Sequence, residues 1–223
     1  MAFTMVHIYI ASKVAEHLEG IKDYSTYILG SIAPDAVHAS DTYTVMDKER
    51  SHLFAEGLHK GKISNTNQVN AWINSIRQFY EDNKNMCNFD FLLGYIVHLY
   101  TDVYNGLKFY YPYLHSIGGE LAGENREHFL RESFGYNYYL YLDYSKNNSL
   151  GVILETAIPE TFEGVIDKNL IRKRVESLFE QEFSTKDISD IDGYTICNHE
   201  TMDKLIDDGS NYVLDELKIL GIE

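Results

Sequence analysis

Cysteine and proline are scarce in this sequence. Its 223 residues include two cysteines, Cys87 and Cys197, and three prolines. The cysteines lie far apart and form no Cys-x-x-Cys pair, which excludes a disulfide framework and a thiolate metal site. Because proline interrupts helices, a chain with so few of them is free to form long ones. Low cysteine content without a disulfide framework is typical of a reducing cytoplasm.

Positive charge and long apolar runs are also in short supply. Lysine and arginine total 19 against 34 aspartates and glutamates, so the formal net charge is −15. Affinity for phosphate backbones and anionic lipids comes mainly from Lys and Arg, so we expect no general binding to nucleic acid or to anionic membranes. No stretch reaches the roughly 18 apolar residues of a membrane span. Residues 1–20 lack the features of a signal peptide, and we expect a cytoplasmic protein.

Helical periodicity is what the sequence does contain. Apolar residues recur at helical spacing along most of the chain, with no internal repeat and no alternation of strands and helices. We therefore expect one all-α domain over residues 1–223, built as a multi-helix bundle. The expected helices include residues 47–60, 68–83, 90 toward Pro112, 125–144, 167–183 and 202–220.

Three capping features accompany these helices. Thr4 is a candidate N-cap of the first helix, and Asp90 is the candidate cap of the central one. Ser184 and Asp187 have the spacing of a capping box, with Asp in place of the usual Glu.

A histidine and an aspartate interrupt the most apolar helix. His98 and Asp102 lie four residues apart within residues 91–104, so they share one helical face. A buried carboxylate requires a partner or a metal ion to offset its lost hydration. The alternative is a satisfied His–Asp hydrogen bond within the core.

Three further segments place polar residues among apolar ones. His7 lies in an apolar stripe, Asp35 follows Pro34 in a turn, and His52 precedes Leu53. Taken singly, Asp35 fits an Asx-turn or helix cap, and each histidine fits a hydrogen bond to a backbone carbonyl. Taken together with His98 and Asp102, the three residues predict one internal metal site.

His128 and Glu132 repeat the four-residue spacing on a later helix. They are either two ligands of one metal ion or an exposed pair within a charged segment. The complete candidate set offers imidazole and carboxylate groups and no thiolate. Such mixed sites suit zinc, and also manganese or iron.

The order of these residues resembles the zinc-dependent phospholipase C family and, more remotely, single-strand nucleases of the same fold. The resemblance is carried by His7, the Gly-Ser-Ile-Ala-Pro-Asp segment at 30–35, Ser51-His52 and residues 94–102, and it extends to His128 and Glu132. It implies an all-helical fold whose metal cleft is built mainly from residues 7–132.

The resemblance also implies a role for each residue of the set. Asp35, His52, His98 and Asp102 would hold one zinc ion, and Asp102 would bridge to a second ion bound by His7. His128 and Glu132 would help to hold a third. Asp35 would also accept a proton from the attacking water, as the catalytic residue.

Two features depart from the family pattern. The secreted enzymes use their N-terminal amine as a ligand beside the early histidine, whereas six residues precede His7 here. The family also places a histidine soon after the bridging aspartate, but residues 103–108 contain none, which leaves His115 as the substitute. We therefore expect between one and three ions.

The function that follows is a metal-dependent phosphoester hydrolase, which uses metal-activated water on a small phosphoester or a phospholipid. One alternative is a non-catalytic metal-binding or interaction protein that retains part of the site. Another is a di-iron carboxylate bundle, which needs two Glu-x-x-His motifs on facing helices, whereas no second predicted helix carries a partner for Glu49-to-His52. The sequence leaves the substrate and the oligomeric state open.

Overall fold

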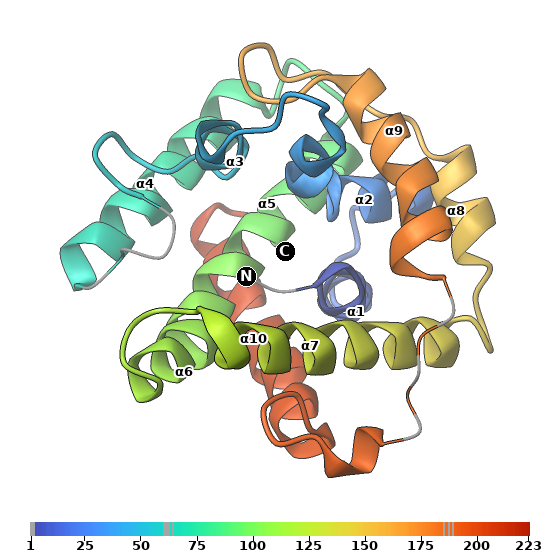
Figure 1. The fold of residues 1–223 in the computed structure, drawn as a ribbon. Helices are drawn as coiled ribbons and strands as arrows, with labels where there is room; N and C mark the ends of the chain where they lie inside the picture. Colours follow the sequence, from blue (N-terminus) through green and yellow to red (C-terminus); the bar gives the residue numbers. More distant parts are fainter. Residues whose placement is uncertain (1–2, 60–62, 64, 185, 187, 189) are drawn as a thin grey trace.

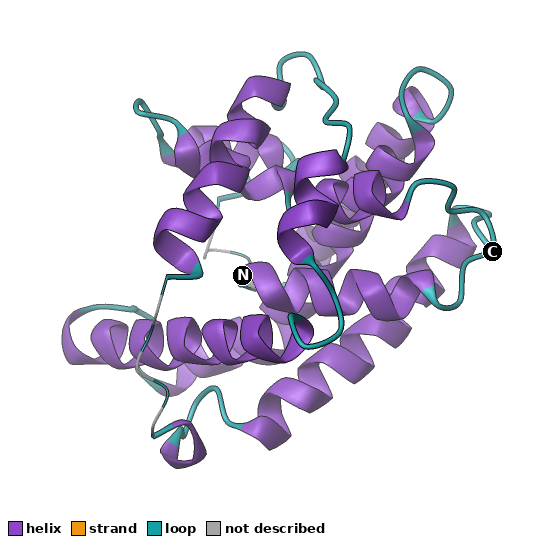
Figure 2. Ribbon diagram, turned by 90° about the vertical axis from the view of Figure 1, so that its right-hand side faces the viewer, coloured by secondary structure: helices purple, strands orange, loops and turns teal. Residues whose placement is uncertain are grey.

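The computed structural model describes residues 3–59, 63, 65–184, 186, 188 and 190–223. These residues form helices and connecting loops, and they contain no strand beyond one isolated bridge between Phe162 and Ile166 (Figure 2). The α-helices are α1 Thr4–Ala15, α2 Tyr24–Gly30, α3 Val45–Ser51, α4 Thr66–Asn83, α5 Phe89–Asn105, α6 Tyr111–Ser116, α7 Gly123–Tyr144, α8 Leu150–Thr156, α9 Lys168–Ser177 and α10 His199–Ile219. The shorter elements are the 3₁₀ helices η1 Ala33–Ala39 and η4 Ile191–Gly193 and the π-helical segments η2 Gly106–Tyr110 and η3 Leu178–Glu182. The predicted all-α fold is confirmed.

Helix α5 runs through the centre of the molecule, with α1, α2, α4 and α10 packed around it (Figure 1). Its sequence is apolar on nearly every face because the helix is surrounded, and almost all of its residues are buried. Asn88 caps the helix by accepting hydrogen bonds from the N–H groups of Asp90 and Phe91. The predicted cap Asp90 instead accepts hydrogen bonds from the N–H groups of Lys22 and Asp23, and so joins α5 to the start of α2.

Two glycines set how closely α2 approaches α5. A Cβ atom on Gly94 would lie 2.0 Å from the carbonyl oxygen of Tyr27, and one on Gly30 would lie 2.3 Å from that of Phe91. Any side chain at either position would push the backbones apart. The close contact places the chain that follows Gly30, including Ser31, against the middle of α5.

Some expected boundaries are wrong for local reasons. The helix predicted over residues 47–60 ends at Ser51, because Leu53 takes a left-handed conformation with φ 55° that a helix cannot continue. The first helix begins after Phe3, and Thr4 lies buried in its first turn rather than at the cap. Asp187 lies outside the described residues, so the capping box with Ser184 stays a prediction. Within the described part of the chain, no helix combines the length and apolar character needed to cross a bilayer.

Candidate metal centre

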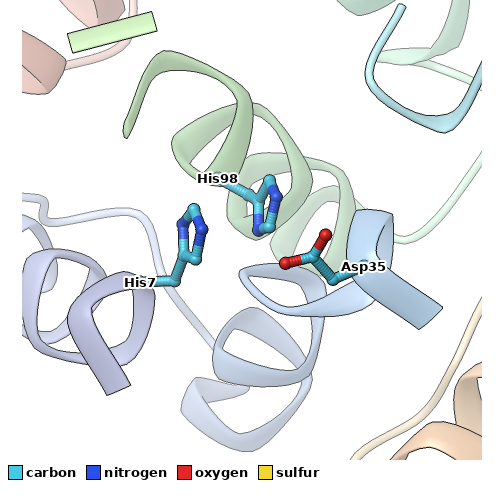
Figure 3. A group of neighbouring side chains, drawn as sticks. All are labelled: His7, Asp35 and His98. Carbon is cyan, nitrogen blue, oxygen red and sulfur yellow. The ribbon is translucent and has the colours of Figure 1, made fainter. Parts of the chain in front are cut away.

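Four segments bring five of the predicted residues together. His7 comes from α1, Asp35 from η1, His52 from the end of α3, and His98 with Asp102 from α5. His7, Asp35 and His98 present ligand atoms within 4.8 Å of one another, and so do His52, His98 and Asp102. Figure 3 shows the first three side chains pointing toward a common centre. Residues far apart in the sequence thus form one compact cluster.

The orientation of His98 is set by the chain that follows α2. Its Nδ1 donates a hydrogen bond of 2.8 Å to the carbonyl oxygen of Ser31, a contact that depends on the close crossing of α2 and α5. Burial, together with the neighbouring His7, lowers the pKa of His98 well below its usual value. The ring is therefore neutral, and its Nε2 presents a lone pair to the cluster.

His52 is held from both sides of its backbone. Tyr95 donates from its hydroxyl to the carbonyl of Ser51, and Trp72 donates from Nε1 to the carbonyl of His52 at 2.7 Å. The His52 ring donates from Nδ1 to the Lys48 carbonyl at 3.0 Å. Its Nε2 therefore also faces the cluster as an acceptor. The left-handed Leu53 that follows His52 is local strain next to this site.

The spacing of these acceptor atoms fits a cation. His52 Nε2 lies 3.3 Å from His98 Nε2, 3.3 Å from Asp102 Oδ2 and 3.4 Å from Asp35 Oδ1. Two lone pairs and two carboxylate oxygens at such distances repel one another unless positive charge lies between them. In tetrahedral zinc with ligands at 2.0–2.1 Å, two ligand atoms lie about 3.3 Å apart, as His52 Nε2 does from His98 Nε2 and from Asp102 Oδ2. The donor set therefore fits a zinc ion.

Asp102 uses its second oxygen toward His7. Asp102 Oδ1 lies 3.5 Å from His7 Nε2, and the His7 ring stacks on His98 with centroids 3.7 Å apart. Both ring nitrogens of His7 are buried, and neither has a hydrogen-bond partner among the described residues. A buried imidazole without partners is costly, and a second cation between His7 and Asp102 would satisfy it. Burial alone would raise the pKa of Asp102, but the nearby imidazoles of His52 and His7 hold it well below its usual range.

Lys48 also belongs to the cluster, although it is not among the residues predicted from the sequence. Its side chain is fully buried, and its Nζ lies 2.5 Å from Asp35 Oδ1. Burial would raise the pKa of Asp35, but Lys48 and His52 lower it well below its usual value, so the carboxylate stays ionised. The available signal was the four-residue spacing from Lys48 to His52, which points both side chains to one side of α3.

A cavity of about 590 Å³ adjoins the cluster. Asp35, Lys48 and Asp102 lie on its wall, together with aromatic side chains that include Phe3, Phe54, Trp72, Tyr110 and Tyr111. Both π-helical segments also contribute to it, through Gly106, Tyr110, Gln181 and Glu182. The C-terminal third of the chain therefore shapes the cavity, although the residues of the predicted cleft end at 132.

The structure does not bring His128 and Glu132 into either group of ligand atoms found among the described residues. Glu132 is buried and accepts hydrogen bonds from the N–H groups of Thr195, Ile196 and Cys197 and from His128 Nε2 at 2.6 Å. These bonds satisfy the carboxylate without a metal ion. The role of His128 and Glu132 as ligands of a third metal ion stays a prediction. The same holds for His115, whose side chain is exposed.

Comparison with known proteins gives one match. The family model described as zinc dependent phospholipase C matches residues 6–142, which is more than half of the chain and includes every predicted ligand. No curated protein and no solved structure matches the sequence.

Proposed function

We propose, because the chain belongs to the zinc-dependent phospholipase C family, that it hydrolyses phosphoesters with the help of bound metal. The observation that carries this proposal is the convergence of three imidazoles and two carboxylates beside a cavity. A bound zinc ion supplies Lewis acidity, which polarises a phosphoryl oxygen and makes a water molecule more acidic.

The residues of the cluster have two proposed roles, which are to bind the metal ions and to accept a proton from water. His52, His98 and Asp102 would hold a first ion together with Asp35, and His7 with Asp102 would hold a second. Asp35 is ionised, and its side chain is 12% exposed whereas that of Asp102 is 1% exposed. Asp35 is thus the carboxylate best placed to orient a water molecule in the cavity and to accept its proton.

The cavity suggests the class of substrate. Phe54, Trp72 and Tyr110 give it apolar walls, while Arg126 adds positive charge. This combination suits a small phosphoester or a phospholipid headgroup that carries an apolar portion. We place the reaction in the cytoplasm, since Cys87 and Cys197 are both free thiols.

The test combines metal analysis with turnover. The purified protein should contain zinc rather than manganese or iron, and with zinc it should hydrolyse bis-p-nitrophenyl phosphate or a phosphocholine ester. Asp35→Asn should abolish turnover because it removes the proton acceptor. The matched control is Asp41→Asn, which alters an aspartate whose side chain is 91% exposed and should leave turnover unchanged.

Zinc binding without turnover on a broad panel of phosphodiesters would overturn the hydrolase proposal. That result would favour the non-catalytic metal-binding protein. The absence of any transition metal, both as purified and after incubation with metal salts, would contradict both functions.

A further inference from the structure

Lys48 lies in an unusual place for a lysine. Its side chain has no exposed surface, and its ammonium meets Asp35 Oδ1 at 2.5 Å, an oxygen that also lies near His52 and His38. A buried ammonium costs several kcal/mol of hydration and persists only with a charged partner. Lysine stems usually carry the charge out to water. Here α3 directs the charge inward, to the wall of the cavity.

The oxygen that Lys48 contacts is a point where several groups meet. Asp35 Oδ1 lies 3.4 Å from His52 Nε2 and 3.7 Å from His38 Nδ1. Both of these groups are imidazoles, of the kind that ligate zinc. The lysine therefore occupies a position where a cation with imidazole and carboxylate ligands could otherwise lie.

Two other places where the family would bind a third ion offer it little among the described residues. Residues 103–108 contain no histidine. The carboxylate oxygens of Glu132 are already used by backbone N–H groups of residues 195–197. The positive charge that a third ion would bring is instead present beside Asp35, as part of the polypeptide.

We propose that the ammonium of Lys48 takes the place of a further divalent cation beside Asp35, so that the cluster holds no more than two zinc ions. This inference rests on the proposed function only in assuming that the cluster binds zinc. Lys48 is a positioning residue in this arrangement: it fixes Asp35 at the edge of the cavity and brings its ammonium to that carboxylate. Because that charge lies close to the ions, it also opposes their binding.

The first test counts metal ions in the unmodified protein. The full chain is saturated with zinc, freed of excess and analysed for bound metal per chain. A count of one or two supports the proposal, and a count of three overturns it. This measurement needs no variant, and it decides the matter even if substitutions at Lys48 prevent folding.

The second test removes the charge. Lys48→Met keeps an unbranched apolar stem in the buried position, and Lys48→Arg keeps the charge. Zinc affinity is measured by competition with a chelator, after circular dichroism has shown that each variant is folded. Lys48→Met should bind zinc at least about tenfold more tightly than the unmodified chain, because a nearby repulsive charge is gone. Lys48→Arg should stay within about threefold.

The outcomes separate this inference from the proposed function. Zinc affinity that is unchanged or weaker in Lys48→Met overturns the role of Lys48, as does failure of both proteins to bind zinc. Tighter zinc in Lys48→Met without turnover by either protein supports that role and overturns the hydrolase proposal instead. A merely structural lysine would lower zinc affinity when removed, so the direction of the change is the decisive readout.

Discussion

Helices α5 and α7 both carry a histidine followed four residues later by a carboxylate, and they use the pair differently. On α5, His98 and Asp102 do not form a hydrogen bond with each other. Their side chains face residues from α1, η1 and α3. On α7, His128 Nε2 bonds Glu132 directly at 2.6 Å. The same spacing thus gives an open set of acceptors in one place and a closed hydrogen-bonded pair in the other.

The difference comes from what each helical face meets. The α5 pair faces the His52 ring nitrogen, which is an acceptor, and the ring of His7. The buried negative charge of Asp102 is therefore stable only with a cation nearby. Glu132 faces three backbone donors ahead of α10. A buried carboxylate with several N–H partners is satisfied as an anion, and it fastens the 195–197 loop to α7.

The largest expected effect is a difference in zinc affinity between variants of His98 and His128. His98→Ala should weaken zinc binding more than about 100-fold, since loss of a ligand should exceed the cost of losing a group that only supports one. His128→Ala should change zinc affinity less than about threefold, because its partner Glu132 is satisfied by the loop. Chelator competition measures both. Equal weakening would show that the α7 pair also binds metal and would break the comparison.

The next effect tests how α5 is placed. Gly94→Ala should destabilise the protein by about 3 kcal/mol, because the new Cβ would lie 2.0 Å from the Tyr27 carbonyl oxygen and 2.8 Å from the Ser31 nitrogen. Urea unfolding measures the loss. Gly151→Ala in α8 is the matched control, since the nearest atom to its Cβ lies 3.9 Å away. An unchanged Gly94→Ala would mean that the crossing of α2 and α5 does not hold His98 in place.

Glu132 should matter for stability and not for zinc. Glu132→Gln should cost about 2 kcal/mol, because an amide cannot accept on both sides from the backbone donors that the carboxylate serves. Zinc content should stay unchanged. Glu127→Gln, on the exposed face of the same helix, should leave the urea midpoint where it was. Loss of zinc from Glu132→Gln would instead indicate that Glu132 is a metal ligand.

The smallest expected effect is the pH dependence of stability, which differs between the α5 pair and the α7 pair. Burial lowers the pKa of His98 below 6.5 in the folded state, so the unfolded chain binds the extra proton. Stability of the metal-free protein should therefore begin to fall as pH drops below 6.5. His38, whose burial lowers its pKa to about 4, adds to the same loss.

Glu132 should respond only at lower pH. Burial would raise its pKa, but the N–H groups of Cys197, Thr195 and Ile196 lower it below 4.5, so its contribution is present above that value and lost beneath it. Urea midpoints with chelator across pH should show both losses. Glu132→Gln should reduce only the loss below pH 4.5. If Glu132→Gln also changed the loss of stability between pH 6.5 and 4.5, the assignment of that loss to the histidines would be contradicted.

Lys48 and Leu53 illustrate what the sequence could not reveal about the site. Lysine in an amphipathic helix normally reaches water, and only the packing of α3 beside η1 turns Lys48 inward to Asp35. The pattern of apolar residues continued past Leu53, so the predicted helix was too long. The left-handed turn at Leu53 ends the helix next to His52, where Tyr95 and Trp72 donate hydrogen bonds to the carbonyls of Ser51 and His52.

By itself the sequence determined the helical class and the set of polar residues that lie among apolar ones. These features are local, since periodicity and spacing act within a few turns of one helix. Only the tertiary structure decided that α1, η1, α3 and α5 bring their polar groups to one centre while α7 directs Glu132 to a loop. That outcome depends on contacts between distant segments, such as the one between Gly30 and Gly94, which spacing along the chain does not encode.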